Sequence, residues 1–216
     1  MNNKVRRFAA LQSICLALIA ASATGAMAAD FHDTENHWAA QAIDIWSDNA
    51  VIHGHEGAFR PDDTVTRGEL AVMLDRIMKY TETAENTYSD LGDTWYTEAV
   101  LKLAASGIIE GDGSVIRPED SVTREEAAVM FARAFELKPA DESELNFTDA
   151  SDISDWALDA VLALSERGFV NGFEDGTFRP GTSMSRAEFV TMVNNAVTGF
   201  YTEAGTYTAE DKLTGI

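Results

Sequence analysis

One pattern occurs three times along the chain, and this repetition restricts the fold to an assembly of three equivalent units. Each copy begins with an aromatic-x-Asp motif, continues through a tryptophan, a glycine and an Arg-Pro pair, and ends in a Thr/Ser-Arg-x-Glu motif. The repeated aspartates are Asp33, Asp90 and Asp149, the tryptophans Trp38, Trp95 and Trp156, the glycines Gly54, Gly111 and Gly172, and the motif arginines Arg67, Arg124 and Arg186. Copies one and two are offset by 57 residues at every one of these positions, so chance does not explain the agreement.

The pattern divides the chain into repeat 1 (29–84), repeat 2 (85–143), repeat 3 (144–200) and a short tail (201–216). Each repeat is predicted to contain two helices joined by a turn-rich loop. Apolar residues follow an i, i+1, i+4 spacing in the first helix and an i, i+3, i+4, i+7 spacing in the second. Two short helices cannot bury both apolar stripes alone, so such units stack and share a core. We therefore predict a mainly α fold with the second helices in a central three-helix bundle and the first helices outside it.

The ends of the first helices are also marked in the sequence. Gly107 and Gly168 are expected to end this helix in repeats 2 and 3, because glycine accepts a left-handed C-terminal conformation. Repeat 1 has Ala50 at the same point, so its helix end is left open.

Residues 1–28 are typical of a secretory signal peptide. A basic start precedes an apolar run and a small-x-small cleavage site that ends at Ala28. The uninterrupted apolar run is shorter than the roughly 20 residues that a membrane span needs, so we expect no membrane span after cleavage. Cys15 is the one cysteine and lies within this segment. We therefore expect a secreted protein without disulfides.

The charge of the chain excludes several classes of partner. It has 16 Lys and Arg residues against 36 Asp and Glu residues, and no acid lies in the predicted leader. Such a surface repels nucleic acid and anionic lipid, so we expect neither as a partner. The acids are spread along the chain and none forms an isolated constellation with a base. We accordingly expect no enzyme activity, no metal and no cofactor.

The Thr/Ser-Arg-x-Glu motif opens the second helix of each repeat. Its hydroxyl and its glutamate form the S/T-x-x-E pattern of a capping box. Capping does not explain the arginine, because the N-terminal end of a helix is already positive. Two interpretations stay open: a salt bridge to a nearby acid such as Asp33 or Asp63, or an anion site made of free helix N–H groups and the guanidinium. The second expects Arg124→Ala and Arg186→Ala to weaken ligand binding without unfolding the protein.

The repeated tryptophans, near the start of each first helix, have two interpretations as well. Each can pack in the core, as is expected of Trp46 on an apolar stripe, or can present an indole face on which a sugar ring stacks. Core packing is the more ordinary role of a single tryptophan. Sugar contact is favoured only where a tryptophan and a motif arginine lie together.

Taken together, these motifs resemble the S-layer homology (SLH) domain, whose hallmark is a Thr-Arg-Ala-Glu-like stretch. The stretches VTRGE, VTREE and MSRAE, the loops that end in Arg-Pro and the three tandem copies carry the resemblance. It implies a pseudo-threefold body around a central helical bundle, with binding grooves between the repeats. It also implies non-covalent attachment to bacterial cell-wall polysaccharide, often through pyruvylated mannosamine residues, and hence a cell-wall or S-layer location.

The resemblance places the candidate ligand-binding residues at four repeated positions. The motif arginines would contact the acidic sugar and the repeated tryptophans would line the groove, with the repeated aspartates and glycines in the adjoining segments. Gly68 and Ile116 depart from the family pattern, so the three grooves are not expected to bind equally. The alternative is a peptidoglycan tether or an assembly protein of the outer envelope or S-layer, with other surface-layer proteins as partners.

Overall fold

The structure is a computed structural model that describes residues 31–140 and 144–203. The predicted signal peptide and Cys15 lie outside these ranges, as does the predicted tail beyond Glu203. Within them the fold is mainly α and contains no β-strand, only isolated bridges between single residues. The mainly α fold class is therefore confirmed. No helix among the described residues has the length and apolar character needed to cross a bilayer.

Each repeat contributes a short outer helix and a longer inner helix. The outer helices are α2 (Ala40–Asp48), α4 (Thr97–Ala105) and α6 (Leu158–Ser165), and the inner helices are α3 (Arg67–Met78), α5 (Arg124–Ala134) and α7 (Arg186–Glu203). A 3₁₀ turn, η1 (Ala150–Asp152), precedes α6. Gly107 and Gly168 have the positive φ predicted for the end of the outer helix, and Ala50 adopts it too, so all three outer helices end alike.

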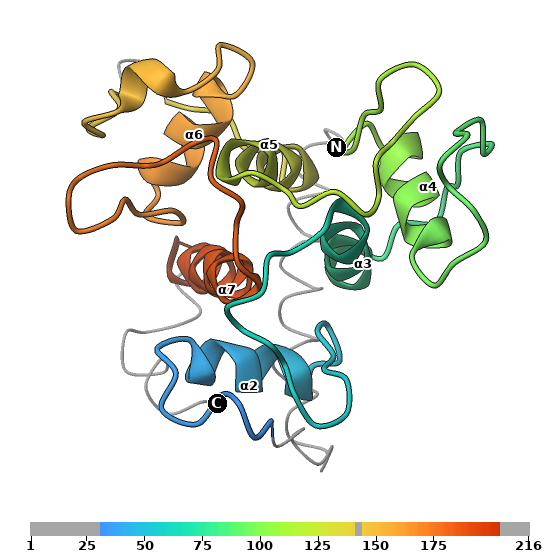
Figure 1. Ribbon diagram of the computed structural model, residues 1–216. Coiled ribbons are helices and arrows are strands. Elements are labelled where there is room, and N and C mark those ends of the chain that lie inside the picture. Colours follow the sequence, from blue (N-terminus) through green and yellow to red (C-terminus); the bar gives the residue numbers. More distant parts are fainter. Residues whose placement is uncertain (1–30, 141–143, 204–216) are drawn as a thin grey trace.

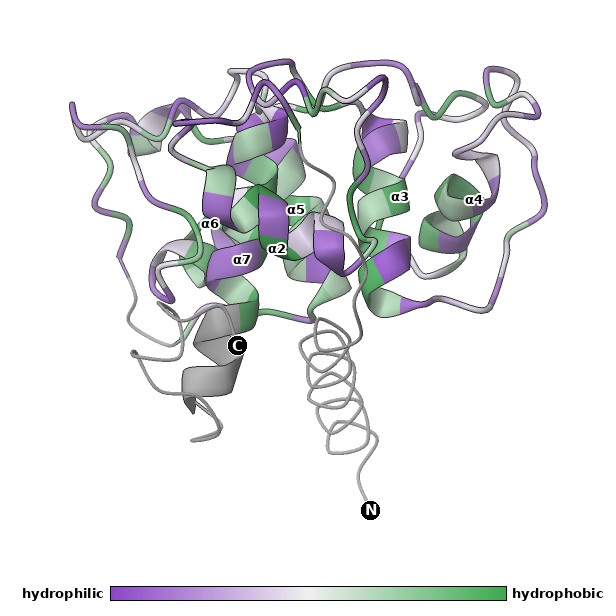
Figure 2. Cartoon of the chain, turned by 90° about the horizontal axis from the view of Figure 1, so that it is seen from below, coloured by the Kyte–Doolittle hydropathy of each residue, from purple (hydrophilic) through white to green (hydrophobic). Residues whose placement is uncertain are grey.

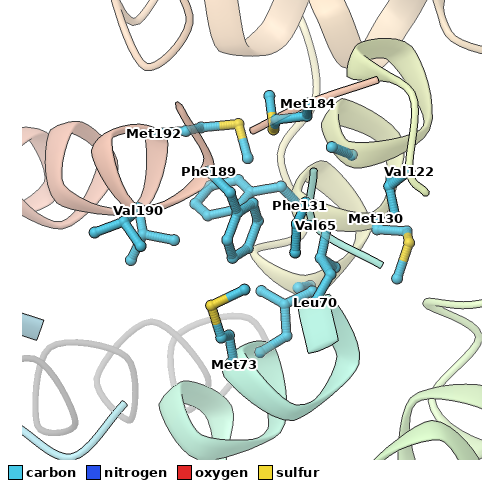
Figure 3. Packing of buried hydrophobic residues seen from close by; sticks show 14 of the residues in the cluster. Val65, Leu70, Met73, Val122, Met130, Phe131, Met184, Phe189, Val190 and Met192 are labelled. Carbon is cyan, nitrogen blue, oxygen red and sulfur yellow. The ribbon is translucent and has the colours of Figure 1, made fainter. Parts of the chain in front are cut away.

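The inner helices form the centre of the molecule. Viewed along the bundle, α3, α5 and α7 surround a common axis and α2, α4 and α6 lie outside them in pseudo-threefold order (Figure 1). Side chains from all three inner helices meet there, including Leu70, Phe131 and Phe189, each of them fully buried (Figure 3). This is the predicted arrangement of central bundle and outer helices.

Each outer helix packs mainly against the inner helix of the preceding repeat. The contacting pairs are α3 with α4, α5 with α6 and α7 with α2. The last pair joins repeat 3 to repeat 1, so the three repeats form a closed ring. Every repeat therefore completes the core of its neighbour, which explains why a single helix pair need not bury both of its apolar stripes.

Three backbone hydrogen bonds close the ring at its axis. Val65 N–H donates to the carbonyl of Met184 (3.0 Å), Met184 to that of Val122 (2.9 Å) and Val122 to that of Val65 (2.9 Å). The side chains of these residues lie beside one another in the core (Figure 3). Each residue directly precedes the capping residue of an inner helix, so this cycle sets the position of all three helix starts.

Many of the connecting segments lie at one end of the inner helices and are largely hydrophilic, whereas others run along the sides of the molecule and the helices carry more of the hydrophobic residues (Figure 2). The aromatic-x-Asp motifs, the Arg-Pro loops and the starts of the inner helices belong to these segments. This end of the molecule therefore holds the repeated polar residues.

Because the repeats share one core, we expect damage in one repeat to destabilise all three. Phe189→Ala removes a fully buried ring of α7 and should lower the free energy of unfolding by about 3–5 kcal/mol. Hydrogen exchange under native conditions should then show the same loss of protection in peptides of α3, α5 and α7. Glu35→Ala, at an exposed position, is the control. Unchanged protection in repeats 1 and 2 would show that the repeats unfold independently.

Candidate functional site

Each motif arginine begins the inner helix of its own repeat, and its side chain reaches into the next repeat. Arg67 of repeat 1 donates from Nε to the carbonyl of Ile116 (3.0 Å) and from Nη2 to that of Glu110 (2.9 Å), both in the loop of repeat 2. All three motif arginines are buried, with 5–7% of their surface exposed. The equivalent acceptors are Phe178 and Asn171 for Arg124, and Phe59 and His53 for Arg186. We name the contacts of Arg67, Arg124 and Arg186 interface 1–2, interface 2–3 and interface 3–1.

The glutamates of the same motifs, Glu69, Glu126 and Glu188, have two partners each. Oε2 of Glu188 accepts from the N–H of Ser185, and the Ser185 hydroxyl accepts from the N–H of Glu188, which is the predicted capping box. Capping boxes are also present at the starts of α3 and α5. The second oxygen of each glutamate faces the motif arginine of the preceding repeat. These N–O distances are 2.8 Å for Arg124–Glu188, 2.7 Å for Arg186–Glu69 and 3.6 Å for Arg67–Glu126.

The first N–H groups of the inner helices are also occupied. In α3, Arg67 N–H donates to the carbonyl of Asp120 (3.0 Å) and Gly68 N–H to that of Pro118 (2.8 Å). The loops of repeats 3 and 1 cap α5 and α7 in the same way, with Thr182 and Pro180 for α5 and Asp63 and Pro61 for α7. The expectation of free helix N–H groups for an anion is therefore wrong, because the following repeat already satisfies them.

The arginine at the helix start now has a physical explanation. Its side chain leaves the positive end of its own helix and binds carbonyl oxygens and a carboxylate of the neighbouring repeat. Burial lowers the pKa of Arg67, Arg124 and Arg186 below the ordinary value, and the adjacent glutamate opposes this. Of the two interpretations, the geometry shows an intramolecular ion pair, but with the capping glutamate rather than with the aspartates considered first.

The repeated aspartates hold the Arg-Pro loops. Asp33 accepts hydrogen bonds from two successive N–H groups, those of Phe59 (2.9 Å) and Arg60 (2.7 Å). Asp90 and Asp149 make the same pair of bonds in repeats 2 and 3. Burial raises the pKa of Asp33 and Asp90, but the backbone hydrogen bonds outweigh it and hold the pKa of both carboxyls below the ordinary value.

The repeated glycines allow the loop to pack closely on the aromatic-x-Asp motif. A Cβ on Gly54 would lie 2.3 Å from both the carbonyl oxygen of Ala58 and the ring of Phe31. Gly111 and Gly172 are crowded in the same way by Tyr88 and Phe147 and by a loop carbonyl. Within the molecule these glycines shape the loop.

The residue before each of the repeated prolines Pro61, Pro118 and Pro180 is an arginine that was not among the predicted site residues. Arg60, Arg117 and Arg179, here called the loop arginines, are exposed and have φ values of 58°, 54° and 58°. A positive φ is costly for a residue with a side chain. In each repeat this conformation is maintained by the two hydrogen bonds that the loop donates to the repeated aspartate, here called the aspartate clamp. The recurrence of Arg-Pro in every repeat is the sequence signal that marks these arginines.

The repeated tryptophans are exposed, in contrast to the other repeated residues. Trp38, Trp95 and Trp156 expose 64%, 66% and 58% of their surface, and they are the only exposed large hydrophobic residues in the described part of the chain. The core-packing interpretation is wrong for them and correct for Trp46, which is 3% exposed. Three exposed indoles recur at equivalent positions of the three repeats, so they remain candidate binding residues.

Trp95 and Trp156 lie close in the chain to residues that contact the preceding repeat. At interface 1–2 the ring of Tyr96, 5.3 Å from that of Trp95, fills the space next to Gly68, where an added Cβ would lie 2.9 Å from Tyr96 Cγ. At interface 2–3 the N–H and hydroxyl groups of Ser154, two residues before Trp156, donate to Glu125 of the preceding repeat. In repeat 1, His37, next to Trp38, pairs with Asp62 of the same repeat. Each loop arginine directly follows the residue whose carbonyl accepts from the motif arginine.

Comparison with known families agrees with this threefold organisation. The chain matches the S-layer homology domain at residues 30–71, 87–128 and 146–190. It belongs to the SLH family. The three matched segments together cover more than half of the chain and confirm the resemblance drawn from the motifs.

Similar proteins place SLH segments within much longer chains. An amylopullulanase of Thermoanaerobacterium thermosulfurigenes is 34% identical over 171 residues, covering 76% of this chain but 9% of that protein. A surface-layer 125 kDa protein of Lysinibacillus sphaericus is 28% identical over 90% of this chain and 17% of its own length. A cellulosome-anchoring protein of Acetivibrio thermocellus is 30% identical over 65% of this chain and 34% of its own length.

The burial of the motif arginines predicts a stability role for each SLH repeat. Arg186→Ala should lower the free energy of unfolding by about 3–5 kcal/mol, because it leaves Glu69 and two loop carbonyls without their donor. Arg67→Ala should cost less by about 1 kcal/mol or more, because Arg67 donates no hydrogen bond to Glu126. Urea denaturation of both variants measures the difference. Equal or negligible losses would contradict the assigned contacts.

The aspartate clamp predicts a pH dependence. Since the pKa of Asp90 is lowered in the folded state, its contribution to stability is present above its unfolded pKa of about 3.9 and is lost as the pH falls through the lower folded value. Asp90→Asn should therefore be less stable at pH 7 and should lose less stability than the wild type between neutral pH and pH 3. Urea titrations across this range provide the test, with exposed Glu174→Gln as the control. Parallel pH profiles for wild type and Asp90→Asn would contradict the clamp.

Proposed function

We propose that this SLH protein attaches non-covalently to the bacterial cell wall by binding an acidic, pyruvylated secondary cell-wall polysaccharide at its inter-repeat interfaces. The observation that carries the proposal is that each repeat presents an exposed tryptophan and an exposed loop arginine, and the loop arginine directly follows the residue whose carbonyl accepts from a motif arginine. An indole face offers apolar area to the C–H face of a sugar, and a guanidinium forms bidentate hydrogen bonds with a carboxylate. The combination suits a sugar that carries an acidic substituent.

The comparisons support a role at the cell surface. One relative is named a cellulosome-anchoring protein and others are named surface-layer proteins. An SLH module shared by proteins of such different lengths and names is suited to attachment rather than to one reaction. We therefore propose a secreted, wall-associated protein without catalytic activity of its own, and other surface-layer proteins as further partners.

The described residues divide the work among the repeated positions. The tryptophans would contact sugar rings and the loop arginines would meet the acidic substituent. The motif arginines, aspartates and glycines would hold the loops in place, since most of their polar atoms and close contacts are already committed within the protein. A strongly acidic protein can bind an acidic glycan in this way because the arginines concentrate positive charge at the interfaces.

Sedimentation with purified cell walls tests the proposal. The wild-type protein should sediment with walls that carry pyruvylated polymer and should remain in solution after mild acid has removed the ketal-linked pyruvate. The triple variant Trp38→Ala/Trp95→Ala/Trp156→Ala should bind at least about tenfold more weakly, since buried tryptophans dominate many interfaces. Its free energy of unfolding should change little, because the three side chains are exposed.

The controls separate the glycan from the rest of the wall. Glu35→Ala, exposed and outside the repeated motifs, should bind as the wild type does. Equal binding to walls before and after removal of the pyruvate would refute the acidic glycan and favour peptidoglycan as the ligand. Wild-type binding by the triple variant would refute the role of the tryptophans.

A further inference from the structure

The three interfaces are not equivalent in the partners that they provide for their motif arginine. Arg124 and Arg186 each donate a hydrogen bond to a motif glutamate, at 2.8 and 2.7 Å. Arg67 lies 3.6 Å from Glu126 and donates no hydrogen bond from Nη1 among the described residues. At interface 1–2 one edge of the guanidinium is therefore held only by a long ion pair.

The aromatic contacts of the motif arginines differ in the same sense. The guanidinium of Arg186 lies 4.6 Å from the ring centre of Phe59, and that of Arg124 lies 5.0 Å from that of Phe178. Repeat 2 has Ile116 at the equivalent position, so Arg67 lacks this cation–π contact. Its charge is compensated by fewer intramolecular contacts than the charges of its two counterparts.

The loop arginines repeat this difference. Arg179 donates to Asp175 at 2.9 Å and lies 3.8 Å above the ring of Phe173, and Arg60 has a carboxylate oxygen of Asp63 at 3.8 Å. Arg117, which is exposed, has no carboxylate within ion-pair distance in the part of the chain that the structure describes. Among the three loop arginines, Arg117 alone lacks a carboxylate at ion-pair distance within the described residues.

Arg67 and Arg117 influence each other. Burial is the main cause of the lowered pKa of Arg67, and the positive charge of Arg117 lowers this pKa further, against the opposing effects of Glu126, Asp120 and Asp90. Of these acids, Asp90 already accepts two backbone hydrogen bonds. Two cations that raise each other's energy at one interface are stabilised when an anion binds between them.

The residue that follows each motif arginine also favours interface 1–2. At interface 2–3 this residue is Glu125, a buried carboxylate that accepts hydrogen bonds from Ser154 and would repel an anion beside Arg124. At interface 1–2 it is Gly68, which carries no charge and leaves room for the ring of Tyr96 next to the exposed Trp95. Interface 1–2 thus combines the arginine pair that makes the fewest ion-pair and cation–π contacts with a nearby exposed indole, and it has Gly68 in place of the buried acid.

From these contacts we infer that interface 1–2 is the principal anion-binding interface of the ring, with Arg117 as the residue that recruits the carboxylate of the glycan and Arg67 Nη1 as the second donor. The inference rests on the proposed function and goes beyond it by ranking the three interfaces. Interface 3–1 ranks second because Arg60 has only a long ion pair. Interface 2–3 ranks last because Arg179 is paired and stacked and Glu125 lies nearby.

Calorimetric titration with 4,6-pyruvylated N-acetylmannosamine as the probe tests the ranking. Each loop arginine can be replaced by glycine without strain, because all three have a positive φ that glycine accepts. Arg117→Gly should weaken binding of the probe about tenfold, as expected for the loss of a charge-assisted hydrogen bond. Arg60→Gly and Arg179→Gly remove the same group at the two lower-ranked interfaces and should each weaken binding less than Arg117→Gly does, with Arg179→Gly having the smallest effect.

Two further measurements make the test specific. The methyl ester of the probe has no negative charge, so it should bind wild type and Arg117→Gly equally weakly. The Nε–Hε resonances of Arg67 and Arg117 in ¹⁵N NMR spectra should shift when the acidic probe is added, whereas those of Arg124 should not.

The outcomes separate the inference from the proposed function. If the wild type binds the acidic probe but Arg117→Gly binds it equally well, or if Arg179→Gly has the larger effect, the ranking of the interfaces is overturned. If the wild type binds neither the probe nor pyruvylated cell walls, the proposed function fails and this inference fails with it.

Discussion

The cycle of backbone hydrogen bonds among Val65, Val122 and Met184 is the constraint on which the rest of the structure depends. It fixes three helix starts around one axis, so that the loop of each repeat lies against the inner helix of the preceding one. The carbonyl groups of each repeated proline and of the residue two positions later then cap that helix, and its motif arginine reaches the next loop. Helix capping and the arginine contacts donate from each repeat to the following one, whereas the backbone cycle at the axis donates in the opposite direction, so each repeat is bonded to both neighbours.

Ion pairs also connect each repeat to the following one. A protein with 36 acidic and 16 basic residues buries three arginines, which is tolerable only where each guanidinium finds acceptors. Backbone carbonyls supply two acceptors per arginine, and the motif glutamate of the following repeat faces its third side. Because a carboxylate has two oxygens, the same glutamate caps its own helix and meets its neighbour's arginine. The short motif thereby encodes both a helix start and a contact between repeats.

Much of the fold could be predicted from the sequence, because it depends on local patterns. Apolar spacing located the helices, the S/T-x-x-E pattern located the capping boxes, and the repetition implied a shared core. The partners across interfaces could not be predicted, since nothing local indicates that Arg67 binds loop residues some 50 positions later, at Ile116 and Glu110. The helix starts were expected to be open to a ligand for the same reason, as the groups that occupy them belong to another repeat.

The candidate site was predicted unevenly. The tryptophans were selected by their repetition, but only the structure shows that they are exposed while Trp46 is buried. The aspartates and glycines were selected as binding residues, and their contacts show roles in shaping the loop. The loop arginines were missed because their positive φ and the clamp that maintains it depend on a carboxylate 27 residues upstream of Arg60 and Arg117 and 30 upstream of Arg179.

The pairing of α7 with α2 has a consequence for how such arrays can vary in length. Once the third repeat has closed on the first, no inner helix is left with an uncovered side on which a fourth repeat could dock. With two repeats, one inner helix and one outer helix would lack a partner. With four repeats, one repeat would have no place in the ring. Gene duplication can therefore extend an array of this kind without loss only by whole triplets, each forming its own closed body.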